Sequence, residues 1–179
     1  MKNNILNIVD ENGNVIGEET REKIHEQGLL HKEIHVWFYT PKKEIIFQHR
    51  DKNKDTFPNL LDATVGGHVE KGEDYINTAI KETKEETGID LILENLRLVK
   101  IRRSCSKDSV TGKINNVLRA IYFYEFTGDL KDLKIENKEA IGFETWLLNK
   151  LESLNEEDKK KFIPNIVSGY LDIFKEVLE

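Results

Sequence analysis

The segment from Gly66 to Gly88 constrains the fold more than any other part of the chain, because it joins a glycine-rich turn to a strongly patterned helix. Small and apolar side chains recur three and four positions apart after Asp74, which predicts an amphipathic helix. Gly88 stands where a glycine ends a helix by adopting a left-handed backbone. The stripe that we expect to pack on the core consists of Ile76, Ala79, Ile80 and Thr83.

The same helix carries Glu82, Glu85 and Glu86 on an adjacent face. Like charges three and four positions apart destabilise a helix by about 0.2–0.5 kcal/mol per pair, so something should offset the repulsion. Carboxylate oxygens are the ligands that Mg²⁺ and Mn²⁺ prefer, and the pattern therefore indicates a magnesium site, with Mn²⁺ as an alternative. A solvated helix rich in glutamate and lysine would explain residues 81–87 taken alone.

The spacing of glycines and glutamates over the longer segment 67–89 favours the metal site over a solvated helix. The chain resembles the Nudix box, in which a glycine is followed at fixed intervals by four glutamates, a second glycine and an aliphatic residue. The matching positions are Gly67, Glu73, Glu82, Glu85, Glu86, Gly88 and Ile89. Lys81 and Thr83 depart from the pattern, which has arginine and an aliphatic residue there. Lysine lacks the planar fork with which arginine pairs with a carboxylate, so bracing of Glu73 by Lys81 would be looser.

The resemblance implies an α/β fold, the Nudix α/β/α sandwich, with a mixed β-sheet between the box helix and the terminal helices. We expect a single domain over residues 1–179, with the box at 67–89. The implied activity is Mg²⁺-dependent hydrolysis of a diphosphate linkage, by water attack at phosphorus, in a nucleoside diphosphate derivative or a related small molecule.

The resemblance also implies roles for single residues. The metal ligands would be Gly67 (through its carbonyl), Glu82, Glu85 and Glu86. The catalytic candidates are Glu82, Glu85 and Glu139, with Glu82 the first choice for the base, Glu139 the second, and Glu136 a rival of Glu139. Glu73, Lys81 and Gly88 would be structural. The candidates for binding substrate phosphates are Arg50, Lys54, Arg102 and Arg103, although adjacent strand residues such as the last two face opposite sides. Specificity would lie in loops 51–59 and 104–116.

The first half of the chain resembles the Nudix subgroup that includes isopentenyl-diphosphate isomerase. In that enzyme, histidines near the positions of His25 and His31 belong to a second metal site; two polar residues near a strand start are the plainer interpretation, and both stay open. The essential cysteine of the isomerase would fall at Gly66, and its glutamate pair at Asn115 and Val117, which disfavours isomerase chemistry. A non-catalytic nucleotide-binding regulatory module is a further alternative.

The composition narrows the choice of partners and compartment. A net charge of −6 over 179 residues disfavours a general nucleic-acid or membrane-surface binder. The single cysteine, Cys105, allows no internal disulfide and fits a reducing compartment. We find no segment typical of a signal peptide or a membrane span and expect a cytoplasmic protein. Exchange of the N-terminal hairpin between subunits would offer a route to a homodimer.

The remaining elements follow from turn and capping signals. Asn12-Gly13 between apolar runs predicts a hairpin over residues 5–17, and Thr20 and Gly28 bracket a short helix. Strands are expected at 31–40, 44–50, 96–103, 117–126 and 140–148, and C-terminal helices at 155–162 and 164–178, the last with Pro164 at its start.

Overall fold

The computed structural model describes residues 5–54 and 56–179. Residues 1–4 and residue 55, which fall in the predicted N-terminal segment and in loop 51–59, lie outside the described residues. Strands β1 (Ile5–Val9) and β2 (Val15–Thr20) pair antiparallel as a hairpin of their own, at the place that the Asn-Gly pair indicated. Within the described part of the chain, no helix is both long enough and apolar enough to cross a membrane.

The larger sheet is mixed and has β3 (His31–Tyr39) at its centre. Its other strands among the described residues are β4 (Glu44–Arg50), β5 (Leu61–Asp62), β6 (Val65–His68), β7 (Leu96–Lys107), β8 (Ile114–Glu125) and β9 (Ala140–Leu147). The strand order is β5-β4-β3-β8-β7, with β6 on β3 and β9 on β4; β3 and β8 run parallel and the other pairs antiparallel. The predicted α/β fold with a mixed sheet is confirmed.

One edge of β3 is shared by two partners, and this division positions the site. Residues 33–36 pair with β6, whereas Phe38 and Tyr39 pair with β4. Thr64 fills the point where the partners separate: its hydroxyl accepts a hydrogen bond from the Phe38 amide at 2.9 Å and donates one to the Ile46 carbonyl. Side chains of β4 and β6 therefore diverge around a space beside β3.

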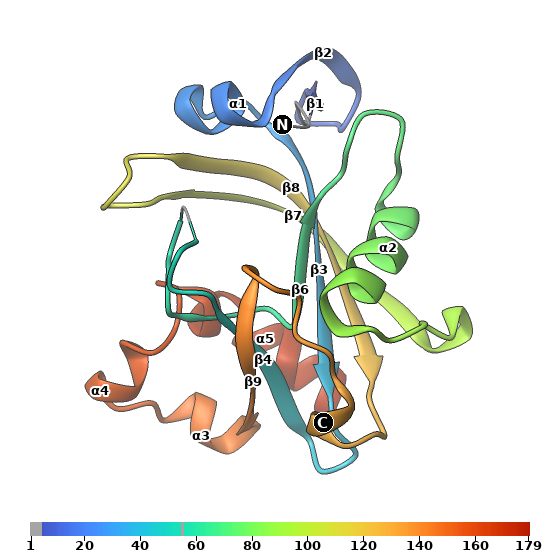
Figure 1. Cartoon of the computed structure of the whole chain (residues 1–179), viewed down its shortest axis with the longest axis vertical. Coiled ribbons are helices and arrows are strands. Elements are labelled where there is room, and N and C mark those ends of the chain that lie inside the picture. Colours follow the sequence, from blue (N-terminus) through green and yellow to red (C-terminus); the bar gives the residue numbers. More distant parts are fainter. Residues whose placement is uncertain (1–4, 55) are drawn as a thin grey trace.

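Side chains that alternate along β3 contribute to two hydrophobic cores, one on each face of the sheet. Ile34, Val36 and Phe38 pack on the face that carries helix α2 (Tyr75–Thr87), and Trp37 packs on the face that carries α5 (Ile166–Leu178) (Figure 1). Full burial of side chains of this size contributes about 1.5–3 kcal/mol each. The two helices are thereby fixed on opposite sides of the strand that they share.

Helix α2 has the predicted ends, but its buried face differs from the prediction. Asp74 caps its start, because the carboxylate accepts the Asn77 amide at 2.8 Å, and Gly88 ends it with φ +73°. Ala79 and Thr83 of the predicted stripe are fully buried, but Ile76 is 37% exposed, and Thr78, which was not in the stripe, is fully buried. Small residues face the sheet here because the helix lies close to β6, as the contact at Gly67 described below shows.

Helix α1 (Arg21–Gln27) lies between Thr20 and Gly28 as predicted, but the C-terminal region differs. Helix α4 has only the residues Glu156–Lys159, because residues 161 and 163 instead exchange backbone hydrogen bonds with Leu61, at 2.7 and 3.0 Å. Helix α3 (Leu148–Glu152) was not predicted, and α5 begins after Asn165, which leaves Pro164 outside it. Two short 3-10 helices span Leu93–Asn95 and Leu130–Asp132, and β7 runs to Lys107, beyond its predicted end.

Candidate functional site

A cavity of about 850 Å³ lies beside β3 and is lined by residues of α2, β3, β4, β6, β7, β8 and α5. The residues selected from the sequence that line it are Arg50, Lys54, Gly67, Lys81, Glu82, Glu85, Glu86, Arg102 and Glu139. Arg103 turns elsewhere: it donates to the Asn116 side chain at 2.8 Å and forms an ion pair with Glu11 at 3.3 Å. Elements far apart in the sequence thus bring carboxylates and cations to one space.

Gly67 allows the box helix to approach the sheet. A Cβ atom at this position would lie 2.5 Å from Cγ of Glu82, closer than carbon atoms can pack. Glu82 is therefore held against the backbone of β6. Burial raises the pKa of the Glu82 carboxyl to about 7, and the negative charge of Glu85 adds to the shift.

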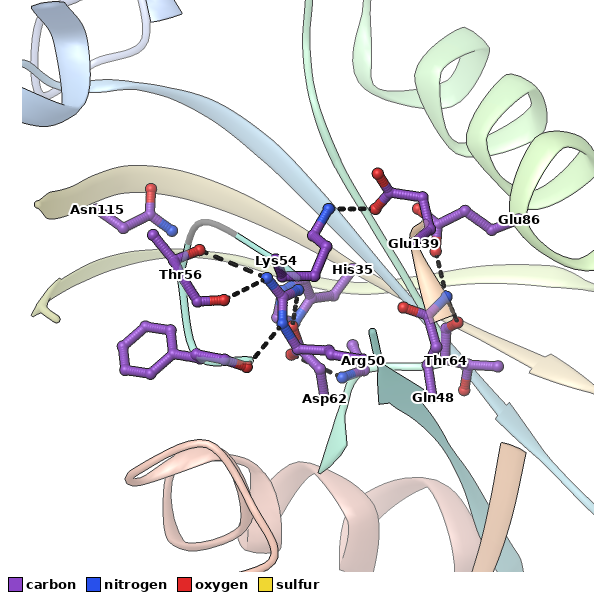
Figure 2. Close-up of polar contacts among 12 residues, drawn as sticks. His35, Gln48, Arg50, Lys54, Thr56, Asp62, Thr64, Glu86, Asn115 and Glu139 are labelled. Atoms are coloured by element: carbon purple, nitrogen blue, oxygen red, sulfur yellow. Dashed lines mark hydrogen bonds and ion pairs between the residues drawn. The ribbon is translucent and has the colours of Figure 1, made fainter. Parts of the chain in front are cut away.

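Glu86 is the most buried carboxylate of the three, with 4% of its surface exposed. Its Oε2 accepts a hydrogen bond of 2.6 Å from the Gln48 amide, which also donates to the Thr64 carbonyl at 3.4 Å (Figure 2). Burial raises the pKa of Glu86 well above its ordinary value, a shift that the neutral Gln48 amide only partly opposes. The carboxylate is hydrogen-bonded, but this partner supplies no positive charge.

This arrangement fits a hard divalent cation. Carboxylate oxygens with raised pKa values share one cavity wall, and a dication would relieve both their repulsion and their burial. The donor set of carboxylates and a nearby main chain suits Mg²⁺ or Mn²⁺.

Lys54 forms an ion pair with Glu139 (Figure 2), and the negative charge of Glu139 contributes to the raised pKa of Glu86. The backbone reinforces this contact, because the Asp51 amide donates to the Glu139 carbonyl at 2.9 Å. Glu136 lines the same part of the cavity, and its pKa is raised by burial and by the charge of Glu139. The loop that carries Lys54 is thus tied to the segment that precedes β9.

Arg50 holds the same loop in shape. Its guanidinium forms an ion pair with Asp62 at 3.0 Å and donates to the carbonyls of Thr56 and Phe57 at 2.8 and 3.2 Å (Figure 2). Arg102 lies across the cavity, where its guanidinium stacks 4.3 Å from the Tyr170 ring centre. Both cations line the cavity, and both already have protein partners.

The box residues expected to be structural form a compact brace. Lys81 Nζ lies 3.2 Å from a Glu70 oxygen and 3.3 Å from a Glu73 oxygen, so a lysine here contacts two carboxylates. Glu73 also accepts from the Thr78 hydroxyl at 3.2 Å, which ties the loop to the first turn of α2.

Sequence reasoning missed several cavity residues that other elements supply. Gln48 and His68 were not selected, and neither was the buried ion pair in which Arg119 donates to Glu33 at 2.5 and 2.8 Å. The nearby Tyr170 hydroxyl makes a 2.8 Å hydrogen bond with His35 Nδ1. The sequence feature that could have revealed Glu33 and His35 is their alternation with apolar residues in a strand that is otherwise apolar and buried.

Comparison with known proteins identifies the family. A family profile described as the NUDIX domain matches residues 29–166. An uncharacterised Nudix hydrolase of Clostridium acetobutylicum is 29% identical over 175 residues, which cover 94% of this chain and 78% of that relative. A Nudix hydrolase of Yersinia pestis is 39% identical over 84 residues, 47% of this chain and 46% of its own length, so the match spans under half of that relative.

Solved structures show the same fold at low identity. DR0079 from Deinococcus radiodurans superposes with a TM-score of 0.68 at 16% identity, over 98% of this chain and 99% of that one. The NUDIX domain of Shewanella oneidensis NrtR, solved with ADP ribose, superposes with a TM-score of 0.60 at 11% identity, over 90% of this chain and 100% of that one. Because the profile covers most of the residues that form the sheet and the cavity, the chain belongs to the Nudix hydrolases, a family of pyrophosphohydrolases.

Proposed function

We propose that this chain hydrolyses a diphosphate linkage in a nucleoside diphosphate derivative or a related small molecule, with Mg²⁺, or Mn²⁺ in its place, as the cofactor. The observation that carries the proposal is the position of Glu86, a buried carboxylate beside Glu82 in the wall of an 850 Å³ cavity. Carboxylates that are buried without a positively charged partner lower the free energy of unfolding unless a cation is bound. The presence of Glu82 and Glu86 in the cavity wall therefore favours a cation-dependent activity.

The residues that would hold the cation are Glu82, Glu85, Glu86 and the carbonyl of Gly67. When bound, the cation would offset charge on the phosphate oxygens and lower the pKa of the attacking water. Glu82 is the proposed base, because its carboxylate lines the cavity among the proposed cation ligands, where the attacking water would be held. Glu139 is the second candidate, and Lys54 keeps its carboxylate in place.

The cations divide into two proposed roles. Lys54 and Arg102 line the cavity and would contact substrate phosphates. Arg50 would act indirectly by holding loop 51–59, since its donors already bind Asp62 and loop carbonyls. We assign no substrate contact to Arg103, which binds Glu11 and Asn116. Residues 1–179 are proposed to act as one domain.

The two alternatives make different predictions. An isomerase-like enzyme would need acid and base groups where this chain has Gly66, Asn115 and Val117. A non-catalytic nucleotide-binding module would bind ligand without turning it over. The intact glutamates favour hydrolysis over both.

The experiment is release of phosphate or pyrophosphate, with Mg²⁺, from nucleoside di- and triphosphates, nucleotide sugars, ADP-ribose, dinucleotides and isopentenyl diphosphate. Glu86→Gln is compared with Glu94→Gln, the same substitution at an exposed position outside the cavity. We expect hydrolysis of at least one compound class that is lost in the first variant and kept in the second. Ligand binding without turnover, unaffected by Glu86→Gln, would instead support the regulatory module, and conversion of isopentenyl diphosphate without phosphate release would support the isomerase.

A further inference from the structure

The cavity is also lined by polar residues on the face of the sheet that carries α5. Ile34 packs on the α2 face of β3, so the neighbouring Glu33 and His35 point to the other face. Arg119 of β8 and Tyr170 of α5 line the same part of the cavity. This part of the cavity wall has hydrogen-bonding groups that the proposed hydrolysis does not use.

The Glu33 carboxylate is held through only one of its oxygens. Arg119 donates to Oε2 through Nε at 2.8 Å and through Nη2 at 2.5 Å, and the Asn115 amide donates to the same oxygen at 3.4 Å. Among the described residues, none donates to the second oxygen, Oε1. Glu33 is 7% exposed and lines the cavity, so Oε1 is left as an acceptor for a bound molecule.

Asn115 offers a second open acceptor. Because a carboxylate oxygen only accepts, the amide nitrogen of Asn115 faces Glu33 and its amide oxygen, Oδ1, faces away. Oδ1 is buried and has no hydrogen-bond partner in the part of the chain that the structure describes. A buried acceptor without a donor is costly, and Asn115 lines the cavity, so a ligand can supply the missing donor. We call Glu33 and Asn115 the acceptor pair.

The surrounding charges favour an uncharged donor. Arg119 balances the charge of Glu33, and its third nitrogen donates to the Tyr170 hydroxyl at 3.4 Å, which fixes the guanidinium in place. Arg102 adds a second positive charge, 4.3 Å from the centre of the Tyr170 ring. An ammonium group would be repelled here, whereas a neutral hydroxyl would not.

We propose that the acceptor pair binds two neighbouring hydroxyl groups of the substrate's sugar, such as the 2′ and 3′ hydroxyls of a ribose. Two acceptors on side chains in contact suit two donors on adjacent carbon atoms, and carboxylates bind ribose hydroxyls in other nucleotide sites. The inference rests on the proposed hydrolysis of a nucleoside diphosphate derivative, and it restricts the substrate to compounds with an intact ribose.

The order of groups across the cavity agrees with this assignment. Figure 2 shows Asn115 and Glu86 on opposite sides of Lys54. Glu86 is a proposed cation ligand and Lys54 a proposed phosphate contact, so the sequence of cation, phosphate and sugar matches the sequence of side chains. The sugar is bonded directly to the diphosphate, whereas a nucleobase lies one group farther away. The exocyclic amino group of a base is nevertheless a neutral donor as well, and the test separates the two.

The test measures binding and does not depend on hydrolysis. The probes are the α,β-methylene analogues of ADP and CDP, in which a carbon atom replaces the oxygen between the phosphates, and they are titrated with Mg²⁺ in a calorimeter. Each is compared with its 2′-deoxy and 3′-deoxy forms, and with the matching analogues of IDP and UDP, which lack the amino group of the base. Release of phosphate from the natural compounds is measured separately.

Two variants remove the acceptors, and each is checked for an unchanged fold by circular dichroism. Asn115→Ala removes Oδ1. The double variant Glu33→Leu/Arg119→Met replaces both members of the buried ion pair by apolar side chains, a change that leaves no unpaired charge. Asn116→Ala is the matched control, because Asn116 is the next residue of β8 and contacts Arg103 and the Gly28 carbonyl on the other face.

In the wild type, we expect each deoxy form of at least one analogue to bind at least about 10-fold more weakly than its parent, since the lost donor leaves a buried acceptor unpaired. Asn115→Ala should abolish the discrimination at one hydroxyl and the double variant at the other, whereas Asn116→Ala should keep both. Should Asn115→Ala not fold, the double variant decides.

The inference is overturned if the deoxy forms bind as tightly as the parents, if loss of the base amino group has the effect instead, if both folded variants keep both discriminations, or if no analogue binds. Hydrolysis without discrimination at the sugar would overturn the inference and leave the proposed function standing. Discrimination that depends on the acceptor pair, without hydrolysis of any natural compound, would support the inference and overturn the proposed function.

Discussion

Replacing Glu86 with glutamine should stabilise the metal-free protein while removing its response to Mg²⁺. The substitution keeps the shape of the side chain and an oxygen that can accept from Gln48, which lies 2.6 Å away, but it removes a charge that is 4% exposed. Burial of an ion costs several kcal/mol in effective terms. A hydrogen bond to a charged group offsets about 1.5–3 kcal/mol of this cost. We therefore expect a net gain of about 2 kcal/mol, or about 4–8 °C in Tm for a chain of this size.

The sign of the pH dependence follows from the direction of the pKa shift. The pKa of Glu86 is raised in the folded protein, so the folded state holds this proton more tightly than the unfolded state. The stability that this contributes is complete below the unfolded pKa near 4.5 and is lost as the pH rises through the folded pKa. The advantage of Glu86→Gln should accordingly grow as the pH rises above the unfolded pKa and level off above the folded pKa.

Thermal unfolding with a chelator, and then with saturating Mg²⁺, measures both effects. Glu85→Gln is the control, because Glu85 lies on the same helix but is exposed, and it should change the metal-free Tm by little. A metal-free Glu86→Gln protein that is less stable than the wild type at pH 8, or one that Mg²⁺ stabilises as strongly, would refute the reasoning.

Three further predictions address other parts of the cavity. Lys54→Met removes the partner of Glu139 and a cation of the cavity wall, and should lower kcat/KM by about 10-fold, equal to about 1.4 kcal/mol, with little change in Tm. Gly67→Ala places a Cβ atom 2.5 Å from Glu82 Cγ and should displace that carboxylate, lowering kcat about 100-fold in steady-state assays while circular dichroism stays unchanged. Since the pKa of Glu82 is about 7 without metal, binding of Mg²⁺ near neutral pH should release protons and weaken as the pH falls, which calorimetry in two buffers of different ionisation enthalpy would detect.

The ends of α2 were predictable because they depend on local chemistry, whereas its orientation was not. Asp74 and Gly88 act on the backbone within a few residues, so the sequence contains the whole cause. The buried face depends on how closely the helix approaches β6, and that distance is set by Gly67. Ala79 and Thr83 of the predicted stripe are buried, whereas the larger Ile76 is exposed and Thr78 is buried instead, because the close approach favours small side chains.

The same distinction separates the site residues that were found from those that were missed. The glutamates of α2 lie within one helix, so their spacing places them on one patch. Gln48 lies 38 positions before Glu86 and reaches it only because β3 exchanges one partner strand for another along its edge. A single sequence gives no sign of that exchange.

Strand β6 positions the carboxylates of α2 through its register on β3. Gly67 pairs with Ile34 and faces Glu82, whereas Gly66 pairs with His35 and faces its ring on the other side of the sheet. A one-residue shift of β6 against β3 would exchange these faces and place another residue beside Glu82. The register of this short strand is therefore a requirement of the proposed magnesium site.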